Sequence, residues 1–495
     1  MAHKDGENPP PTAWSQAASA SVRAALHGRD ILHFPGSPEF ADCEAAYFTA
    51  AAAEVRSGAV ARPASTADVS ALLGALRESL PADVPIAVRG AGHATCGGTA
   101  KAASGVTIDM RGLRGVDVLP GEKLFALGLV RIGAHNPPLT TVGGRMPGVG
   151  AIGFLLGGGL SSLSSRFGFG ADMVSVVLAS GEVVRAARDD ERTSDLWDAL
   201  RGGSTNFGIV TAVEIACIPH PATFRGANVF YLPTARRASL RALVDVGSEP
   251  YPGDGRPINH AMWCITHVVG IKLINALLTT TGTAKEVDMA GFVGVWGRIP
   301  LTGGLKAGSH GRFIEEQGKL APKDGNRTLD KTITVRMDFD LLNAMVDLWY
   351  TSVDTMRQRV SGLMMYTLVF QPLSVGMLEA SCRNAPSRPV STTSQGLDPK
   401  EGPLVVVEIC MTWKKAEDDE LMSKEGSKYL EDCISLARQM GKDHRFIFPN
   451  YAWPTEAVMK GYGGDRLAVL RDVAKKWDPE GFFQGQFVGG FKIGR

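Results

Sequence analysis

The first 220 residues alternate between short apolar runs and segments with helical spacing. Over 66–76, apolar side chains recur every three or four residues, and the Ser-Thr-Ala-Asp stretch at 65–68 offers an N-terminal cap. Other runs are rich in Val, Ile and Ala and are bounded by Gly or Pro, as strands often are. Strands are predicted at 60–63, 84–88, 105–110, 173–178 and 182–185. Such an alternation predicts an α/β or α+β domain.

The pattern changes at about residue 222, after which glycine becomes rarer. Strand-like and helical pieces alternate again, which predicts a separate α+β domain. The predicted strands are 364–370 and 404–411, and the predicted helices are 338–353 and 417–440. From about residue 443 the chain returns to Gly and aromatic residues, so we expect this tail to fold back onto the first domain. The resulting units are 1–34, 35–222, 223–442 and 443–495, of which the first is a polar lead-in.

Composition and charge exclude several classes of protein. The 495 residues carry a net charge of +1, which does not favour binding to nucleic acid or to an anionic membrane. Seven cysteines without a CxxC pair indicate neither a disulfide framework nor a zinc site, and we expect no bound metal. We find no signal peptide and no run as long as a membrane span, so we expect a cytoplasmic protein, either a monomer or a weak homo-oligomer. The sequence has no Gly-x-Ser-x-Gly, which makes a nucleophilic hydrolase an unfavoured alternative.

The loop at 89–98 carries the strongest chemical signal. It follows the predicted strand 84–88 and reads Arg-Gly-Ala-Gly-His-Ala-Thr-Cys-Gly-Gly. Backbone N–H groups in such a loop can approach a phosphate closely, because glycine has no Cβ in the way. Arg89 and His93 add a cation and an imidazole. The sequence therefore predicts a pyrophosphate-binding loop with a histidine at its edge.

A second glycine-rich segment, at 148–153, matches Gly-x-Gly-x-x-Gly and allows two interpretations. A Rossmann dinucleotide site needs a buried strand before this motif and a helix after it. Here Gly143–Pro147 precedes the motif, and three glycines at 157–159 follow it closely, which disfavours a long helix. The alternative is a backbone surface that packs against a flat ring or a phosphate. A nicotinamide-dependent dehydrogenase that uses 148–153 stays open as the less favoured hypothesis.

Several motifs in order resemble one enzyme family. They are Arg89-x-x-Gly92-His93, then residues 142–145, 156–161, 166–168, 179–182 and 206–211, and at the C-terminal end 450–451 and 477–483. Together they resemble the berberine-bridge-enzyme-like branch of the FAD-linked oxidases, within the vanillyl-alcohol-oxidase or PCMH-type superfamily. The sequences of these motifs are most similar to those of fungal members from secondary metabolism. The resemblance implies a two-part PCMH-type FAD-binding domain (35–222 with 443–495) and an inserted α+β substrate domain (223–442) with an antiparallel sheet and helices.

The resemblance also implies how FAD is held. His93 matches the histidine that bonds covalently to the flavin ring methyl. Many relatives have a second link from a cysteine, but this chain has Met146 there, and a thioether cannot form that bond. We therefore expect covalent attachment through His93 only. The expected FAD contacts, chiefly through backbone, are Arg89, Gly90, Ala91, Gly92, His93, Ala94, Gly148, Gly150, Gly153, Gly157, Gly158, Ile209, Val210 and Asn450. One departure from the family is at 129–138, where two prolines exclude a full helix.

Two residues are candidates for proton transfer. Glu408 interrupts a strand that is otherwise apolar on both faces, and a buried carboxylate has a raised pKa, as a general base near a flavin requires. A solvent-facing position on an edge strand is its structural alternative. Tyr451 matches a family position that faces the substrate and sometimes acts as base. Tyr366 and Gln371 are expected to line the same cavity.

The leading functional hypothesis is an FAD-dependent oxidase. A base would remove a proton from a small natural product, hydride would pass to flavin N5, and O2 would reoxidise the flavin to give H2O2. A second hypothesis keeps the flavin but makes the net reaction a cyclisation. A third is the dehydrogenase described above. The expected partners are a small-molecule substrate and O2.

Overall fold

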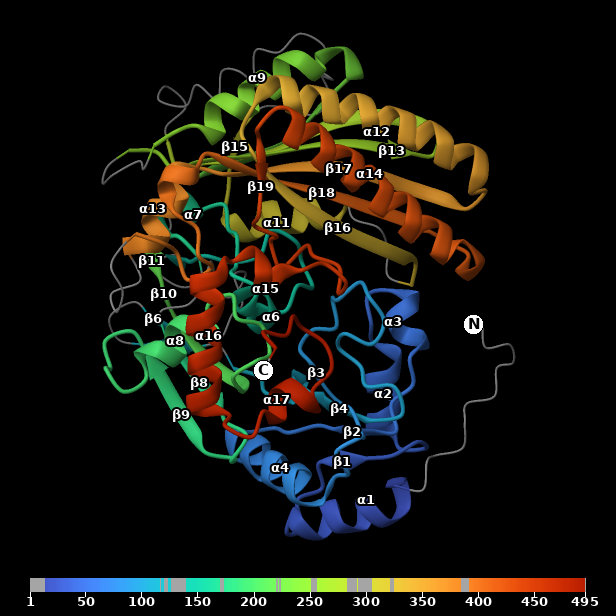
Figure 1. Cartoon of the computed structure of the whole chain (residues 1–495), viewed down its shortest axis with the longest axis vertical. Helices are drawn as coiled ribbons and strands as arrows, with labels where there is room; N and C mark the ends of the chain where they lie inside the picture. Colours follow the sequence, from blue (N-terminus) through green and yellow to red (C-terminus); the bar gives the residue numbers. More distant parts are fainter. Residues whose placement is uncertain are drawn as a thin grey trace.

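A computed structural model of the chain contains a large antiparallel sheet above two smaller sheets (Figure 1). It describes residues 14–115, 117–119, 123–125, 139–169, 173–219, 221, 224–250, 256–282, 292, 305–320, 325–383 and 391–494. The proline-containing segment 129–138 and Asp172, which a Rossmann site would use for the ribose, lie outside these residues. Within the described residues, none of the helices has the length and apolar character needed to span a bilayer.

The N-terminal part is a small, partly parallel sheet with the strand order β1-β2-β4-β3. Strands β2 and β3 both run parallel to β4. Helix α4 begins where the sequence predicts, because the Ser65 side chain accepts a hydrogen bond from the Asp68 N–H at 3.1 Å. The elements are α1 (Trp14–Ala25), β1 (Leu32–His33), α2 (Pro38–Ala45), α3 (Ala50–Glu54), β2 (Ala59–Ala61), α4 (Thr66–Ser79), β3 (Ile86–Arg89), β4 (Val106–Asp109) and the 3-10 turn η1 (Met110–Gly112).

A second sheet is antiparallel, with the strand order β5-β6-β10-β8-β9. It consists of β5 (Asp117–Leu119), β6 (Lys123–Phe125), β8 (Met173–Val177), β9 (Val183–Ala187) and β10 (Ile209–Ala216), and a separate pair joins β7 (Leu139–Thr140) to β11 (Ile218–Pro219). Its helices are α6 (Ala151–Leu156), α7 (Ser164–Phe167) and α8 (Ser194–Leu200). The predicted hairpin at 173–185 corresponds to β8 and β9.

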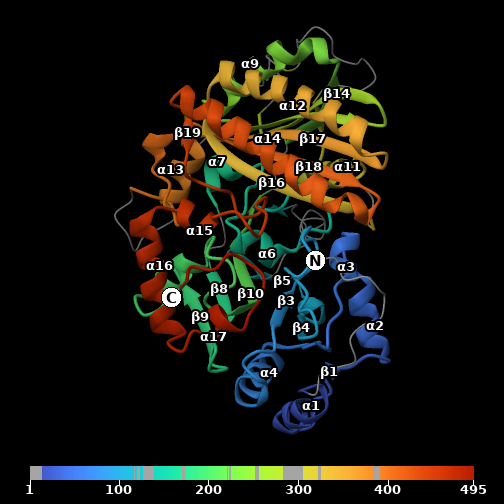
Figure 2. The same cartoon turned by 45° about the vertical axis from the view of Figure 1, so that its right-hand side comes forward.

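The C-terminal segment packs against these N-terminal parts. It contains α15 (Val458–Gly461), α16 (Gly464–Trp477) and α17 (Phe482–Gly485). Residues 486–488 run beside β3, where the Ile86 N–H donates to the Gln486 carbonyl at 2.9 Å and the Val488 N–H donates to the Ile86 carbonyl at 2.7 Å. The red tail accordingly lies among the blue and green elements in Figures 1 and 2.

The third sheet has eight antiparallel strands in the order β15-β12-β14-β13-β17-β18-β16-β19. These are β12 (Arg225–Tyr231), β13 (Asn259–Val268), β14 (Ile271–Thr280), β15 (Lys306–Ala307), β16 (Arg327–Arg336), β17 (Leu363–Leu373), β18 (Leu404–Trp413) and β19 (Asp443–His444). The associated helices are α9 (Arg236–Gly247), α11 (His310–Gly318), α12 (Phe339–Arg359), α13 (Val375–Arg383) and α14 (Asp419–Gln439), with 3-10 turns at Pro233–Ala235, Pro399–Glu401 and Ala416–Asp418.

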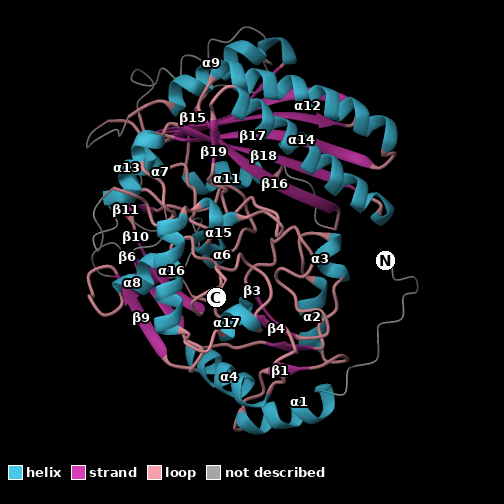
Figure 3. Ribbon diagram, viewed as in Figure 1, coloured by secondary structure: helices cyan, strands magenta, loops and turns pink. Residues whose placement is uncertain are grey.

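Helices α9, α12 and α14 cover only one face of this sheet (Figure 3). Along β18, Val407 and Ile409 pack into the apolar core beneath these helices. Because side chains alternate across a strand, Glu408 and Cys410 lie on the opposite face, toward the smaller sheets. The predicted α+β class is confirmed, and the eight-stranded sheet is antiparallel, as expected for the inserted part of the chain. The uncovered face forms one wall of the cavity described next.

Candidate active site

A cavity of about 1180 Å³ lies between the uncovered face of the large sheet and the smaller sheets. Backbone from four segments with many glycines forms one wall: 90–100, 144–157, 204–212 and 489–491. Side chains of β13, β14, β16, β17 and β18 form the other, together with residues 448–452. A cavity of this size exceeds what a typical small ligand fills, so it has room for a large cofactor and a substrate.

The glycines on the first wall fit a flavin cofactor. A Cβ built at Gly90, Gly98 or Gly153 would have no protein atom within 4 Å, although all three residues line the cavity. A side chain at these positions would therefore extend into space that the glycines leave open. Gly98 also has φ +82°, a conformation that other residues rarely adopt. An extended wall of bare backbone of this kind can contact both a flat ring and a pyrophosphate.

Most of the expected FAD contacts line the cavity. They are Gly90, Ala91, Gly92, His93, Ala94, Gly150, Gly153, Gly157, Ile209, Val210 and Asn450. Gly148 and Gly158 do not. Gly148 has φ +81°, a conformation that other residues rarely adopt, and a Cβ at Gly158 would collide with the Gln395 amide, so backbone conformation and packing explain these two glycines.

The His93 ring is held flat against Phe48. Their ring centroids are 4.2 Å apart and the planes are 10° from parallel. His93 and Met146 both line the cavity, so the imidazole and the thioether face the same space. Asn450 lies against the backbone of α6, since a Cβ at Gly157 would collide with its amide.

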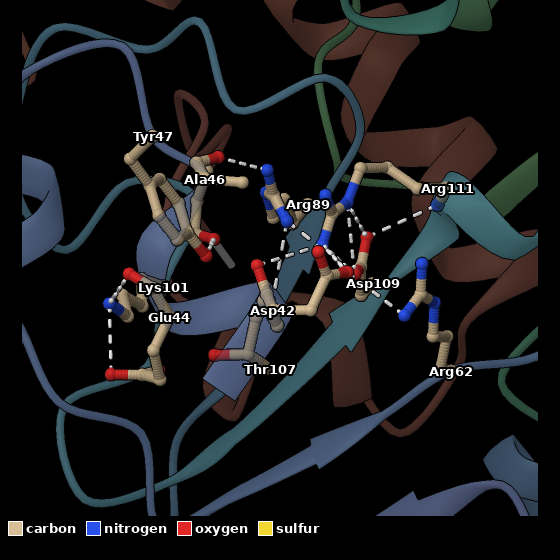
Figure 4. A network of polar contacts seen from close by, with 12 residues as sticks. Asp42, Glu44, Ala46, Tyr47, Arg62, Arg89, Lys101, Thr107, Asp109 and Arg111 are labelled. Atoms are coloured by element: carbon tan, nitrogen blue, oxygen red, sulfur yellow. Dashed lines mark hydrogen bonds and ion pairs between the residues drawn. The ribbon is translucent and has the colours of Figure 1, made fainter. Parts of the chain in front are cut away.

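Arg89 departs from its expected role. Its neighbours Val88 and Gly90 line the cavity, but Arg89 itself faces the other side of β3 and is 1% exposed. There it forms an ion pair with Asp109 at 3.4 Å, donates to the Ala46 carbonyl and lies over the Tyr47 ring (Figure 4). The prediction that Arg89 holds the pyrophosphate is wrong for this reason. The arginine fixes the loop from behind.

The Gly-x-Gly-x-x-Gly segment does not form a Rossmann unit. A helix does begin after Gly150, but α6 has six residues and ends before Gly157. Residues 141–150 lie outside any strand, so no parallel strand leads into the motif. Without a strand and a long helix, the arrangement that places a dinucleotide at a helix N-terminus is missing.

Glu408 lies at the centre of the sheet face that forms the second wall. Strand β18 has neighbours on both sides, β17 and β16, which excludes the edge-strand alternative. The carboxyl is 9% exposed and lines the cavity, and within the described part of the chain it forms no hydrogen bond or ion pair. Burial and the nearby Asp330 raise its pKa well above the ordinary value, while Arg145 acts in the opposite direction. Glu408 is therefore a carboxyl that holds its proton to a higher pH than an exposed glutamate does.

Asp330, on β16, is a site residue that the sequence analysis missed. It pairs across the strands with Cys410, two residues from Glu408, and faces the same cavity. The surrounding protein raises its pKa to about 6, and hydrogen bonds with Cys410 and Thr95 limit the rise. A usable signal was present, because polar residues at 328, 330, 332 and 334 alternate with Leu329, Ile333 and Val335, with Lys331 as the one exception. That pattern is typical of a strand with one polar face.

Arg145, also missed, connects three parts of the chain. It precedes α6, and it donates to Gln371 on β17 and to the Tyr451 hydroxyl. Tyr451 lines the cavity, and burial raises the pKa of its phenol, so the hydroxyl stays protonated at neutral pH. Gln371 does not line the cavity, contrary to expectation, because its fully buried amide accepts a hydrogen bond from Arg145 instead.

Tyr366 does not line the cavity, contrary to expectation. It is fully buried on the helix-covered side of β17, where its ring packs edge-on to Trp349 and Tyr429. Its neighbours Met365 and Thr367 line the cavity instead. The prediction is wrong by one residue, and in a strand one residue reverses the face.

Comparisons with known proteins agree with this geometry. A family model described as an FAD-binding domain matches residues 57–187. The FAD-dependent monooxygenase FUP4 of Fusarium proliferatum is 29% identical over 83% of this chain and 80% of its own. The FAD-dependent monooxygenase drtC of Aspergillus calidoustus is 27% identical over 96% of this chain and 90% of its own.

Two solved structures share the fold. One is 6-hydroxy-D-nicotine oxidase from Arthrobacter nicotinovorans, with a TM-score of 0.72 at 19% identity over 93% of this chain and 97% of that one. The other is glucooligosaccharide oxidase from Acremonium strictum, with a TM-score of 0.69 at 18% identity over 96% of this chain and 98% of that one. At such identities the likeness concerns the fold alone.

Proposed function

Given that this chain is a flavin oxidoreductase with the fold of the berberine-bridge-enzyme-like FAD-linked oxidases, we propose that it oxidises a small, largely apolar natural product, with Glu408 as general base. The observation that carries the proposal is the position of Glu408. It is a carboxyl without a bonding partner among the described residues, on a wall opposite the backbone that fits FAD. Bound FAD supplies a two-electron acceptor that O2 reoxidises, with H2O2 as the product.

The remaining lining explains the choice of substrate class. Val369 lies directly across from Glu408 on β17, Met262 and Met365 line the same sheet face, and Phe448 lines the cavity from the C-terminal segment. These side chains favour an apolar framework and exclude water from it. In this setting the Glu408 carboxylate takes a proton from the substrate, and the protonated Tyr451 hydroxyl offers a hydrogen bond to the same molecule.

We propose further that FAD is attached through His93 alone. Glucooligosaccharide oxidase from Acremonium strictum carries a cysteinyl and a histidyl bond to its FAD. In this chain His93 lines the cavity, and methionine (Met146) stands at the position where a linking cysteine is expected. Acid precipitation of the purified protein tests the proposal. Flavin should stay in the wild-type pellet and move to the supernatant in His93→Ala. Release from the wild type would contradict the covalent bond.

Oxygen insertion is a second candidate, because the fungal relatives FUP4 and drtC are FAD-dependent monooxygenases. Measurement of O2 uptake and H2O2 release in the same reaction separates the candidates. An oxidase releases one H2O2 for each O2 consumed. A monooxygenase consumes O2 without equivalent H2O2 and incorporates ¹⁸O from labelled O2. A cyclisation without net oxidation consumes none.

A further inference from the structure

Arg145 is a buried cation whose bonding partners are all neutral. Its side chain is 9% exposed and lines the cavity. The guanidinium donates to the Gln371 amide and the Tyr451 hydroxyl, and it lies 3.5 Å from the His260 ring nitrogen and 3.6 Å from the Met262 sulfur. Within the described part of the chain, no carboxylate forms an ion pair with it.

No neighbouring group among the described residues forms an ion pair that neutralises the positive charge of the Arg145 guanidinium. Burial and the guanidinium itself lower the pKa of His260 well below its ordinary value, so this ring is neutral. Glu408 and Asp330 face the same cavity but lie beyond ion-pair distance, and the protein raises the pKa of both carboxyls. A buried charge without a counter-ion costs several kcal/mol, so such a residue usually has an anionic partner when the site is filled.

The Tyr451 hydroxyl adds a second donor beside the guanidinium. Its oxygen accepts from Arg145, so its own hydrogen is directed elsewhere. Among the described residues this hydrogen has no acceptor. The ring of Tyr451 is held edge-on against Phe448 at 5.0 Å, which keeps the hydroxyl beside the guanidinium. Arg145 and Tyr451 thus form a two-donor site in the lining of a largely apolar cavity.

We propose that Arg145 and Tyr451 bind an oxyanion of the substrate, so that the substrate is an apolar or aromatic molecule with an acidic oxygen such as a carboxylate or an ionised enol. This inference rests on the proposed function, because it treats the cavity as the substrate site. Gln371 and His260 hold the guanidinium in place from behind, so the anion meets a preorganised donor pair.

Binding of a matched pair of probes to the FAD-loaded protein tests the proposal. The probes are 2-naphthoate and its neutral isostere 2-naphthamide, with affinities measured by isothermal titration calorimetry without turnover. We expect wild type to bind the carboxylate at least tenfold more tightly than the amide. Arg145→Met should abolish this preference, and Arg145→Lys should keep part of it. Arg185→Met is the control, since Arg185 is exposed and pairs with Glu214 at 2.5 Å.

The outcomes are distinct from those of the proposed function. Equal affinity of wild type for the two probes, or an unchanged preference in a flavin-loaded Arg145→Met protein, would overturn the anion site. If Arg145→Met fails to fold, the comparison of the two probes in wild type and Arg145→Lys still decides. If the protein binds naphthoate more tightly than naphthamide but its flavin never turns over with any substrate, the proposed oxidase activity is contradicted. The anion site is still supported in that case.

Discussion

Glu408 and Asp330 form a small acidic patch on an otherwise largely apolar sheet face. The two side chains are diagonal neighbours on β18 and β16, close enough for each negative charge to disfavour the other. Because the protein raises the pKa of both, one of the two carboxyls is protonated over a wide range of pH. Chemistry that needs an ionised Glu408 therefore depends on the state of Asp330.

Replacement of Glu408 by glutamine should remove the base and keep the shape. We expect kcat/KM of Glu408→Gln to fall by roughly 10²–10⁴, the usual contribution of a positioned general base. The flavin content should stay at the wild-type level, because Glu408 lies on the wall opposite the glycine-rich segments. Steady-state kinetics and the flavin absorbance check both statements. A variant with wild-type turnover would show that another group takes the proton.

Replacement of Asp330 by asparagine should shift the pH profile to lower pH. Activity rises with pH as Glu408 loses its proton, and the negative charge of Asp330 delays that loss. Removal of this charge lowers the pKa of Glu408, by roughly 1.5 to 2 units for two charges about 7 Å apart, the usual diagonal separation, at an effective dielectric near 20. The profile of kcat/KM against pH measures the shift. A move toward higher pH, or none, would contradict the coupling.

At the level of elements, the face of a strand decides what its side chains do. Arg89 ends β3, one residue beyond the predicted strand, and Tyr366 belongs to the predicted strand 364–370. Both face away from the cavity that was expected to hold them. The existence of β3 and β17 follows from composition, but the face that meets the ligand depends on the layer packed against each strand. For Glu408 the sequence left a solvent-facing edge strand as an alternative, and the position of β18 between β17 and β16 placed the carboxyl on the cavity side of the sheet.

The buried ion pair behind β3 should be important for stability. Arg89 and Asp109 are 1% and 0% exposed, and the pair joins β3 to β4 (Figure 4). Arg89→Met leaves Asp109 with Arg111 as its remaining cation and should cost about 3–5 kcal/mol, the usual result of breaking a buried pair. Arg185→Met, which breaks an exposed pair, should cost under about 1 kcal/mol. Urea unfolding curves give both values, and equal losses would contradict the argument.

At the scale of the whole molecule, segments far apart in the sequence enclose the cavity. Residues 489–491 from the end of the chain lie against residues 204–205 and the loop at 90–100, while the large sheet supplies the opposite wall. Tight backbone contact holds the tail, because a Cβ at Gly489 would collide with the Thr99 carbonyl. The glycine-rich wall of the cavity is therefore complete only when the C-terminal segment is in place.

Loss of the anchor of this segment should expose the flavin to solvent. Phe487 is 3% exposed and packs against Phe483, with ring centroids 4.5 Å apart. Phe487→Ala should cost about 3–5 kcal/mol, as truncation of a buried aromatic does. It should also increase the fraction of FAD exposed to solvent, which flavin fluorescence measures. Val469→Ala, at an exposed position on α16, is the control and should change neither quantity. A flavin signal unchanged in Phe487→Ala would show that the tail is dispensable for the site.

The sequence by itself determined the local elements, the fold class and the glycine-rich loop that lines the cavity. Helical spacing, capping residues and glycine clusters are short-range signals, so α4, β8, β9 and the loop after β3 could be read from residues a few positions apart. Glu408 was also accessible in this way, because a carboxyl in an apolar strand conflicts with its immediate neighbours.

Only the tertiary structure decided which side chains meet. Asp330 and Glu408 are 78 residues apart and become neighbours through the pairing of β16 with β18. Arg145 reaches Gln371 and Tyr451, which are 226 and 306 residues away along the chain. Strand order, register and the return of the tail are set by the burial of whole faces, a long-range effect that no local pattern encodes. The acidic pair and the guanidinium site exist because of that packing.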